Sequence, residues 1–223
     1  LLNLGAGVVT LTAGAGVTIT GTLTVAQYSS ATLVRTASDT WTVAGIGTSS
    51  GMDLITPTSV AGSGVTLSGG QVSIASSTTI SVNGCFTATY DTYRIVLYMT
   101  TGGTGALAMR LRVAASDNST SNYTTQRLSA GSTSVVGTRS ASQTSWFGHG
   151  MVTGINTLQI DIQRPFLTTT TTALVSSGRG TDANLDMDNF FMGHNTATSF
   201  DGFTIDPGSA ATGTMRVYGL RNS

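Results

Sequence analysis

Residues 107–113, Leu-Ala-Met-Arg-Leu-Arg-Val, decide the fold class, because their large apolar side chains recur at every second position. Arg110 and Arg112 occupy the alternate positions. Successive side chains of a strand point to opposite faces, so this is the pattern of a half-buried strand. Residues 158–164 repeat the pattern and stop at Pro165, which cannot donate a hydrogen bond to a neighbouring strand.

Further strands are predicted on either side of these two. Residues 93–99 are apolar on both faces apart from Arg94, which favours a central strand. Residues 203–205 and 214–218 close the chain as two more strands, and glycines and Ser/Thr/Asn clusters separate all these runs. No stretch shows sustained helical periodicity. The sequence therefore predicts an all-β fold, with a jelly-roll-like β-sandwich as its main part.

The charge composition excludes several classes of protein. Only 9% of the 223 residues are charged, against about 25% in an average soluble domain, and all ten cations are Arg and all ten anions Asp. Long helices and coiled coils are disfavoured without Lys and Glu. The net charge is zero and no Lys/Arg run exists, so we expect no nucleic-acid partner. No apolar run approaches the roughly 20 residues of a membrane helix, so we expect no membrane insertion.

Aromatic residues divide the chain into two zones. Tyr28 and Trp41 are the aromatic residues of the first 85 positions, whereas 13 others lie from Phe86 to Tyr218. A globular core needs large side chains and a thin fibrous segment does not. We therefore expect a shaft-like or accessory region over residues 1–50 and a head domain over residues 51–223.

The first zone contains a weak repeat. Residues 5–12 are echoed by residues 14–20 at an offset of nine, and alternating residues 17–20 and 22–25 flank a glycine. Two such repeats are fewer than the roughly three needed to bury a core, so other copies of the chain, most simply in an intertwined homotrimer, are expected to complete it. The alternative is a flexible Gly/Thr-rich arm.

A small β unit follows the repeat. Residues 31–35 and 40–43 flank a polar turn and are predicted to form a hairpin. The glycine- and serine-rich residues 45–51 are predicted to be a linker to the head domain.

One segment carries a candidate metal site. Oxygen-bearing side chains stand at alternate positions, as at the start of a calcium loop: Asp182, Asn184, Asp186 and Asp188. Met187 replaces the expected glycine, however, and Gly193 replaces the bidentate glutamate. The alternative is a strand that points Leu185 and Met187 inward and the aspartates into solvent, with no metal bound.

Two sets of residues are candidate contacts with partners. Residues 146–150, Trp-Phe-Gly-His-Gly, combine aromatic rings with flexible glycines, so Trp146, Phe147 and His149, together with Tyr123, could contact a receptor if exposed. The favoured alternative is that these residues form ordinary core and turn. Five strand arginines could pair with aspartates of another subunit or form solvated strand faces. They are Arg94, Arg110, Arg112, Arg164 and Arg216.

The sequence gives no reason to expect an enzyme. His149 and His194 have no second ligand at a metal spacing, and the Gly-x-Ser-x-Gly nucleophile pattern is absent. A glycosidase would need two aspartates, since Glu is absent. Cys85 follows a glycine and precedes an aromatic residue, which favours a buried apolar role. No catalytic residue and no cofactor are therefore predicted.

Several segments resemble bacteriophage fibre proteins. The glycine-punctuated start resembles fibre shafts, and residues 51–60 resemble the entry to a C-terminal head domain. Residues 84–95 and 199–222 add to this likeness. The resemblance implies a homotrimeric virion protein, joined to other virion proteins by its N-terminal region, whose head binds a glycan or protein on a bacterial or cyanobacterial surface. A structural capsid fibre or tail adaptor is the alternative, and a polysaccharide-degrading tailspike fits less well because the repeat is short.

Overall fold

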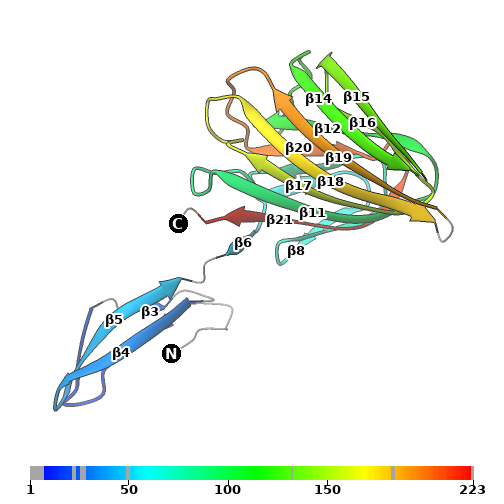
Figure 1. Ribbon diagram of the computed structural model, residues 1–223. Helices are drawn as coiled ribbons and strands as arrows, with labels where there is room; N and C mark the ends of the chain where they lie inside the picture. The colour runs from blue at the N-terminus through cyan, green and yellow to red at the C-terminus, as the bar shows by residue number, and fades with distance from the viewer. Residues whose placement is uncertain are drawn as a thin grey trace. The chain divides into compact units, whose positions relative to one another are not determined.

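The computed structural model describes residues 8–21, 24–25, 29–48, 51–131, 133–181 and 184–221. Every regular element in these ranges is a β-strand, which confirms the all-β class (Figure 1). None of the described segments forms a helix that could cross a membrane. Contacts divide the chain into two compact units, Leu1–Gly51 and Met52–Ser223. The shaft and the homotrimer remain predictions.

The N-terminal unit consists of short paired strands. Strands β4 and β5 form the predicted antiparallel hairpin, and β2 joins β5 in parallel, while β1 pairs with β3. The bounds are β1 Val9–Thr10, β2 Thr18–Thr20, β3 Thr24–Val25, β4 Ser29–Ala37 and β5 Thr40–Thr48. The linker prediction was wrong for residues 45–48, because β5 continues through them as the partner of β4.

The C-terminal unit contains two antiparallel sheets. The large sheet has the order β15-β14-β19-β18-β17-β11-β21-β9-β8, and β6 also pairs with β21. Its strands are β6 Met52–Ile55, β8 Val65–Ser68, β9 Gln71–Ser77, β11 Thr92–Thr101, β14 Tyr123–Gly131, β15 Ser134–Gln143, β17 Gly154–Gln163, β18 Thr171–Thr181, β19 Asn184–His194 and β21 Ala211–Leu220. Consecutive hairpins β14-β15, β17-β18 and β18-β19 account for much of it.

The small sheet has the order β13-β12-β20-β10-β7, and β16 pairs with β12. Its strands are β7 Ser59–Ala61, β10 Ile80–Asn83, β12 Gly105–Val113, β13 Ser116–Asp117, β16 Trp146–Met151 and β20 Gly202–Asp206. In Figure 1 the labelled strands β12, β16 and β20 lie behind the large sheet. One face of the large sheet is therefore covered.

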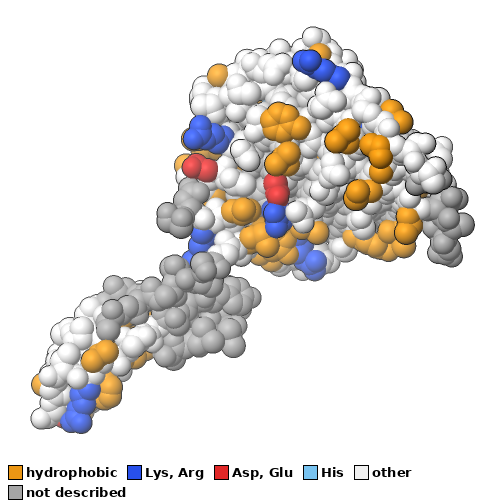
Figure 2. All heavy atoms as spheres, viewed as in Figure 1, with side chains coloured by type: hydrophobic (Ala, Val, Ile, Leu, Met, Phe, Trp, Pro, Cys, Tyr) orange, Lys and Arg blue, Asp and Glu red, His pale blue; other side chains and the backbone are white. Residues whose placement is uncertain are grey.

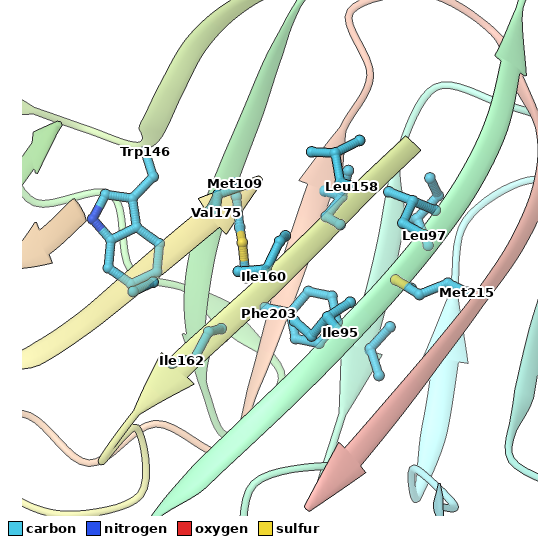
Figure 3. Close-up of a cluster of buried hydrophobic side chains, with 14 of the residues drawn as sticks. Ile95, Leu97, Met109, Trp146, Leu158, Ile160, Ile162, Val175, Phe203 and Met215 are labelled. Carbon is cyan, nitrogen blue, oxygen red and sulfur yellow. The ribbon is translucent and has the colours of Figure 1, made fainter. Parts of the chain in front are cut away.

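A single apolar core joins the two sheets. Ile160 of β17 and Val175 of β18 point into it from the large sheet, and Met109 of β12 and Phe203 of β20 from the small one (Figure 3). All four side chains are 3% exposed or less. Burial of such apolar area is the main favourable contribution to folding. The predicted β-sandwich is confirmed by this packing.

The strands predicted from alternation lie where the sequence placed them. Residues 107–113 fall in β12, and residues 93–99 fall in β11, which pairs with β17 on one side and β21 on the other. Strand β17 ends at Gln163, two residues before Pro165. Period-two patterning thus located these strands and their faces, but not all of their bounds: β17 begins at Gly154, four residues before the predicted start.

The first and last strands of the sandwich are tied by an ion pair. Arg221 donates from Nε and an Nη atom to the two carboxylate oxygens of Asp53, each at 2.7 Å, and Tyr90 Oη donates to the same carboxylate at 2.7 Å. The Arg221 guanidinium lowers the pKa of Asp53. This clamp reinforces the pairing of β6 with β21.

The two faces of β17 should respond differently to truncation. Ile160→Ala removes a fully buried side chain and should lower the free energy of unfolding by about 2–5 kcal/mol. Gln159→Ala, on the neighbouring exposed position, should change it by about 0.5 kcal/mol or less. Denaturant titrations at one fixed chain concentration measure both. Equal effects would show that the register of β17 is wrong.

Candidate functional site

The face of the large sheet that points away from the core carries an unusual set of side chains. We call this the outer face. Register places Tyr98 of β11 opposite Thr157 of β17, Thr157 opposite Gly178 of β18, and Gly178 opposite Met187 of β19. Directly opposed residues of an antiparallel pair share a face. These four residues therefore form one row across the outer face.

The middle of this row is hollow. Two adjoining depressions of about 630 and 390 Å³ share the residues Thr157, Gly178 and Met187. The hollow exists because Gly178 has no side chain, and the Thr157 hydroxyl folds back to donate to the Gly178 carbonyl at 3.1 Å. Tyr98 and Ile155 stand on one side, and Met187 stands on the other. The depression is therefore largely apolar.

Large apolar side chains surround the hollow. Nine of them are 43–82% exposed on the outer face, and Figure 2 shows hydrophobic side chains spread over this side of the sandwich. They are Val96, Tyr98, Leu128, Val135, Ile155, Leu174, Leu185, Met187 and Phe191. Nine large apolar side chains exposed on one face exceed the scattered single ones of an ordinary surface, and such a face marks an interaction surface on a soluble protein.

The described part of the candidate calcium segment lies on β19, the strand that carries Met187. Its side chains are arranged differently from the sequence prediction. Asp182 and the side chain of Asn184 lie outside the described residues. Among the described residues no cluster of three metal ligands exists. Asp188 is fully buried on the inner side, and Asp186 shares its face.

The alternative prediction for this segment was wrong. It placed Leu185 and Met187 inward and the aspartates in solvent, whereas the described side chains point the opposite way. Leu185 is 82% and Met187 55% exposed, because Phe190 and Met192 further along β19 enter the core and fix the face. A strand cannot change face without a bulge, so the aspartates must follow those two residues inward.

Arginines compensate the buried aspartates. Arg127 of β14 donates from Nε to Asp188 Oδ1 at 2.8 Å, and Arg179 of β18 lies 4.0 Å from Asp188 Oδ2. Arg179 also donates to Asp186 Oδ2 at 3.1 Å. A buried carboxylate needs such partners, because desolvation would otherwise make its charge very costly.

The aromatic candidates lie in the core and not on a receptor surface. Trp146 and Tyr123 are fully buried, and Phe147 is 7% exposed; the rings of Trp146 and Tyr123 meet edge to face at 5.6 Å. A bulge between β12 and β16 allows the consecutive residues Trp146 and Phe147 both to enter the core, with Phe147 at φ +81°. The side chain of His149 lies outside the described set. The core interpretation therefore holds for these three rings.

His194 lies in the same aromatic cluster. Its imidazole is fully buried against Tyr123 at 4.7 Å and Phe200 at 4.9 Å between ring centroids, and Nδ1 faces the Thr196 carbonyl at 3.3 Å. Burial lowers the pKa of His194. Burial also raises the pKa of Tyr123 to about 12, and that of the Cys85 thiol, so Cys85 behaves as the buried apolar residue predicted.

Most of the candidate inter-subunit arginines already have partners in their own chain. Arg94 binds both oxygens of Asp161 on the neighbouring strand at 2.6 and 2.7 Å, and Arg112 binds Asp117. Arg110 donates to the Thr144 carbonyl, and Arg216 to the Gln71 side chain. Arg94 and Arg112 therefore already have aspartates beside them in the sheet. Pairing with aspartates of another subunit stays a prediction for Arg110, Arg164 and Arg216.

Sequence reasoning missed the outer face. It treated apolar residues as inward-facing, although β18 and β19 carry apolar residues at both odd and even positions, such as Leu174 and Val175 or Phe190 and Phe191. Apolar residues at both odd and even positions indicate apolar side chains on both faces of a strand. This signal was not applied to β18 and β19. Comparison with known proteins adds nothing further, since no family model, curated protein or solved structure matches the chain.

The buried ion pair should be far more sensitive to neutralisation than the outer one. Asp188→Asn leaves the Arg127 charge without its carboxylate on the inner face, while Arg179 keeps Asp186, so unfolding should become easier by about 3–5 kcal/mol. Asp161→Asn, at a carboxylate whose side chain is 25% exposed, is the matched control and should cost about 1 kcal/mol or less. Chemical denaturation of both variants tests this; similar losses would contradict the inward orientation of Asp188.

His194 should make the fold sensitive to mild acid. Its unfolded imidazole titrates near pH 6.5, and burial places the folded pKa below that value. Below about pH 6.5 the unfolded state takes up a proton that the folded state resists, so stability is complete above this pH and falls as the pH drops toward the folded pKa. Melting temperatures at pH 7.5 and 5.5 should differ in the wild type and differ less in His194→Phe. An unchanged difference in the variant would assign the effect to other groups.

Proposed function

We propose that the chain is a fibre protein of a tailed bacteriophage, in which the C-terminal sandwich attaches to the host surface. The observation that supports it most is the incompleteness of the N-terminal unit. Within residues 8–48, Val25 and Ala31 are the side chains described as buried, whereas Val8, Val34 and Trp41 are 36–64% exposed. A unit whose described side chains bury so little gains stability by packing against other copies. A multi-chain shaft is an assembly of this kind.

The C-terminal unit suits the other half of the proposal. Its two sheets share one large apolar core, which gives a rigid body for presenting a binding surface. A trimeric head would contact the host at several points at once, so weak individual contacts with a surface glycan or protein would suffice for attachment. This attachment is the step that separates a receptor-binding fibre from a purely structural virion component.

Attachment can be measured with the purified full chain. Labelled protein should bind host bacteria, and soluble surface glycan from the same strain should compete if the receptor is a glycan. Heat-unfolded protein at the same concentration is the control for non-specific adsorption. No binding at concentrations where virions adsorb would contradict the receptor-binding role and favour a structural capsid fibre or tail adaptor.

A further inference from the structure

We propose that the outer face of the large sheet, centred on Met187, is the surface through which copies of this chain pack together. The proposal rests on the oligomeric fibre proposed above and assigns its contact surface in the C-terminal unit. Met187 lines both adjoining hollows and stands in the row with Tyr98, Thr157 and Gly178.

The apolar area is of the size that subunit contacts bury. The nine outer-face side chains are on average about half exposed, which at ordinary residue areas amounts to roughly 800 Å². A standard interface buries about 800 Å² on each partner. The core of such a contact is poor in charged residues and rich in aromatic residues and methionine, as this face is with Tyr98, Phe191 and Met187.

The outer face carries both a projection and a depression. Leu185 is 82% exposed, the largest exposed fraction among the described large apolar side chains, and it stands at the edge of the 630 Å³ hollow over Gly178 and Gly180. A surface with a projection and a depression can place the projection of one copy in the depression of the next, head to tail around a rotation axis. One face therefore supplies both halves of such a contact.

Charge does not oppose this packing. Arg94 and Asp161 on the outer face neutralise each other across β11 and β17. Two rows of outward-pointing residues cross the sheet from β11 to β15, one through Met187 and one through Asn189. None of the described side chains in these two rows is charged. Arg216 and Arg139 stand in neighbouring positions of this face, opposite Val96 and Gln126 respectively. Two copies can therefore bring the rows through Met187 and Asn189 together without like-charge repulsion, which is costly at an interface.

The end strand of the large sheet is uncovered as well. All ten residues of β15 are exposed, including Val135 at 72% and Val136 at 54%, and one of its edges has no neighbouring strand. Soluble monomers protect a long edge with lysines, prolines or bulges pointing outward. β15 has neither Lys nor Pro, Arg139 is its one charge, and its irregularity in register lies between Ser140 and Gln143, at the opposite end from Val135 and Val136. A neighbouring copy at this end of the sheet would cover both the edge and the adjoining outer face.

Single-cysteine variants of the full chain test the proposal. Cys85 is fully buried, so an introduced thiol is the reactive one. Met187→Cys and Val113→Cys place thiols at positions that are 55% and 41% exposed in the single chain, on the outer face and on the small sheet respectively. If copies cover Met187, the thiol at position 187 should react with a maleimide at least about tenfold more slowly than that at position 113. Equal rates would overturn the proposal.

A second variant keeps the test decisive. Met187→Arg introduces a buried like charge in every copy, so the outer faces should separate even if the N-terminal units still hold the copies together. In this variant a thiol introduced by Leu174→Cys, at an outer-face position that is 52% exposed in the single chain, should react with a maleimide at least about tenfold faster than the same thiol beside Met187, while circular dichroism keeps its strand signal. An unchanged rate would overturn the proposal. If the variant does not fold, the thiol rates decide.

Host-cell binding separates this interface from the proposed fibre function. Wild-type protein that protects position 187 but binds no host cell overturns receptor binding and supports the interface. Protein that binds cells as a single chain, with position 187 reactive, supports attachment and overturns the interface.

Discussion

The structure depends on the burial of one face of the ten-stranded sheet. Side chains of a strand alternate between faces, so a residue such as Ile160 can reach the small sheet only if its neighbours Gln159 and Asp161 face away from it. The core joins both sheets through the inner face alone. The residues at the alternate positions therefore form the outer face. In β11, β17, β18 and β19 these residues include large apolar ones as well as polar ones.

The same constraint explains the buried charges. Phe190 and Met192 point from β19 into the core. Asp188 and Asp186 stand two and four positions before Phe190, so their side chains lie on the same side of the strand. Arg127 and Arg179 on the two flanking strands meet them there. If β19 slipped by one residue against β14 or β18, Phe190 would become exposed and these charges would separate. The ion pairs therefore reinforce the register that the apolar residues set.

The sequence predicted the parts of the fold that depend on local pattern. The alternation in residues 107–113 and 158–163 and the two-sided run at 93–99 all became strands, and a turn joins the two strands of the first hairpin as expected. It could not predict contacts that depend on strand order. Arg94 finds Asp161, 67 positions away, because β11 and β17 are neighbours, and the hollow arises because Gly178 lies between Thr157 and Met187. The inward turn of both Trp146 and Phe147 depends on a bulge, which alternation alone does not reveal.

Both units expose apolar residues that a single chain leaves uncovered: the valines and Trp41 of the first, and the surroundings of Met187 in the second. Our central claim is that copies of the same chain cover them. An electron-microscopy reconstruction of the purified full chain tests this most directly. We predict three chains related by a three-fold axis, with each outer face packed against a neighbouring copy. A single chain, or an assembly in which the outer faces all point to solvent, would contradict the account.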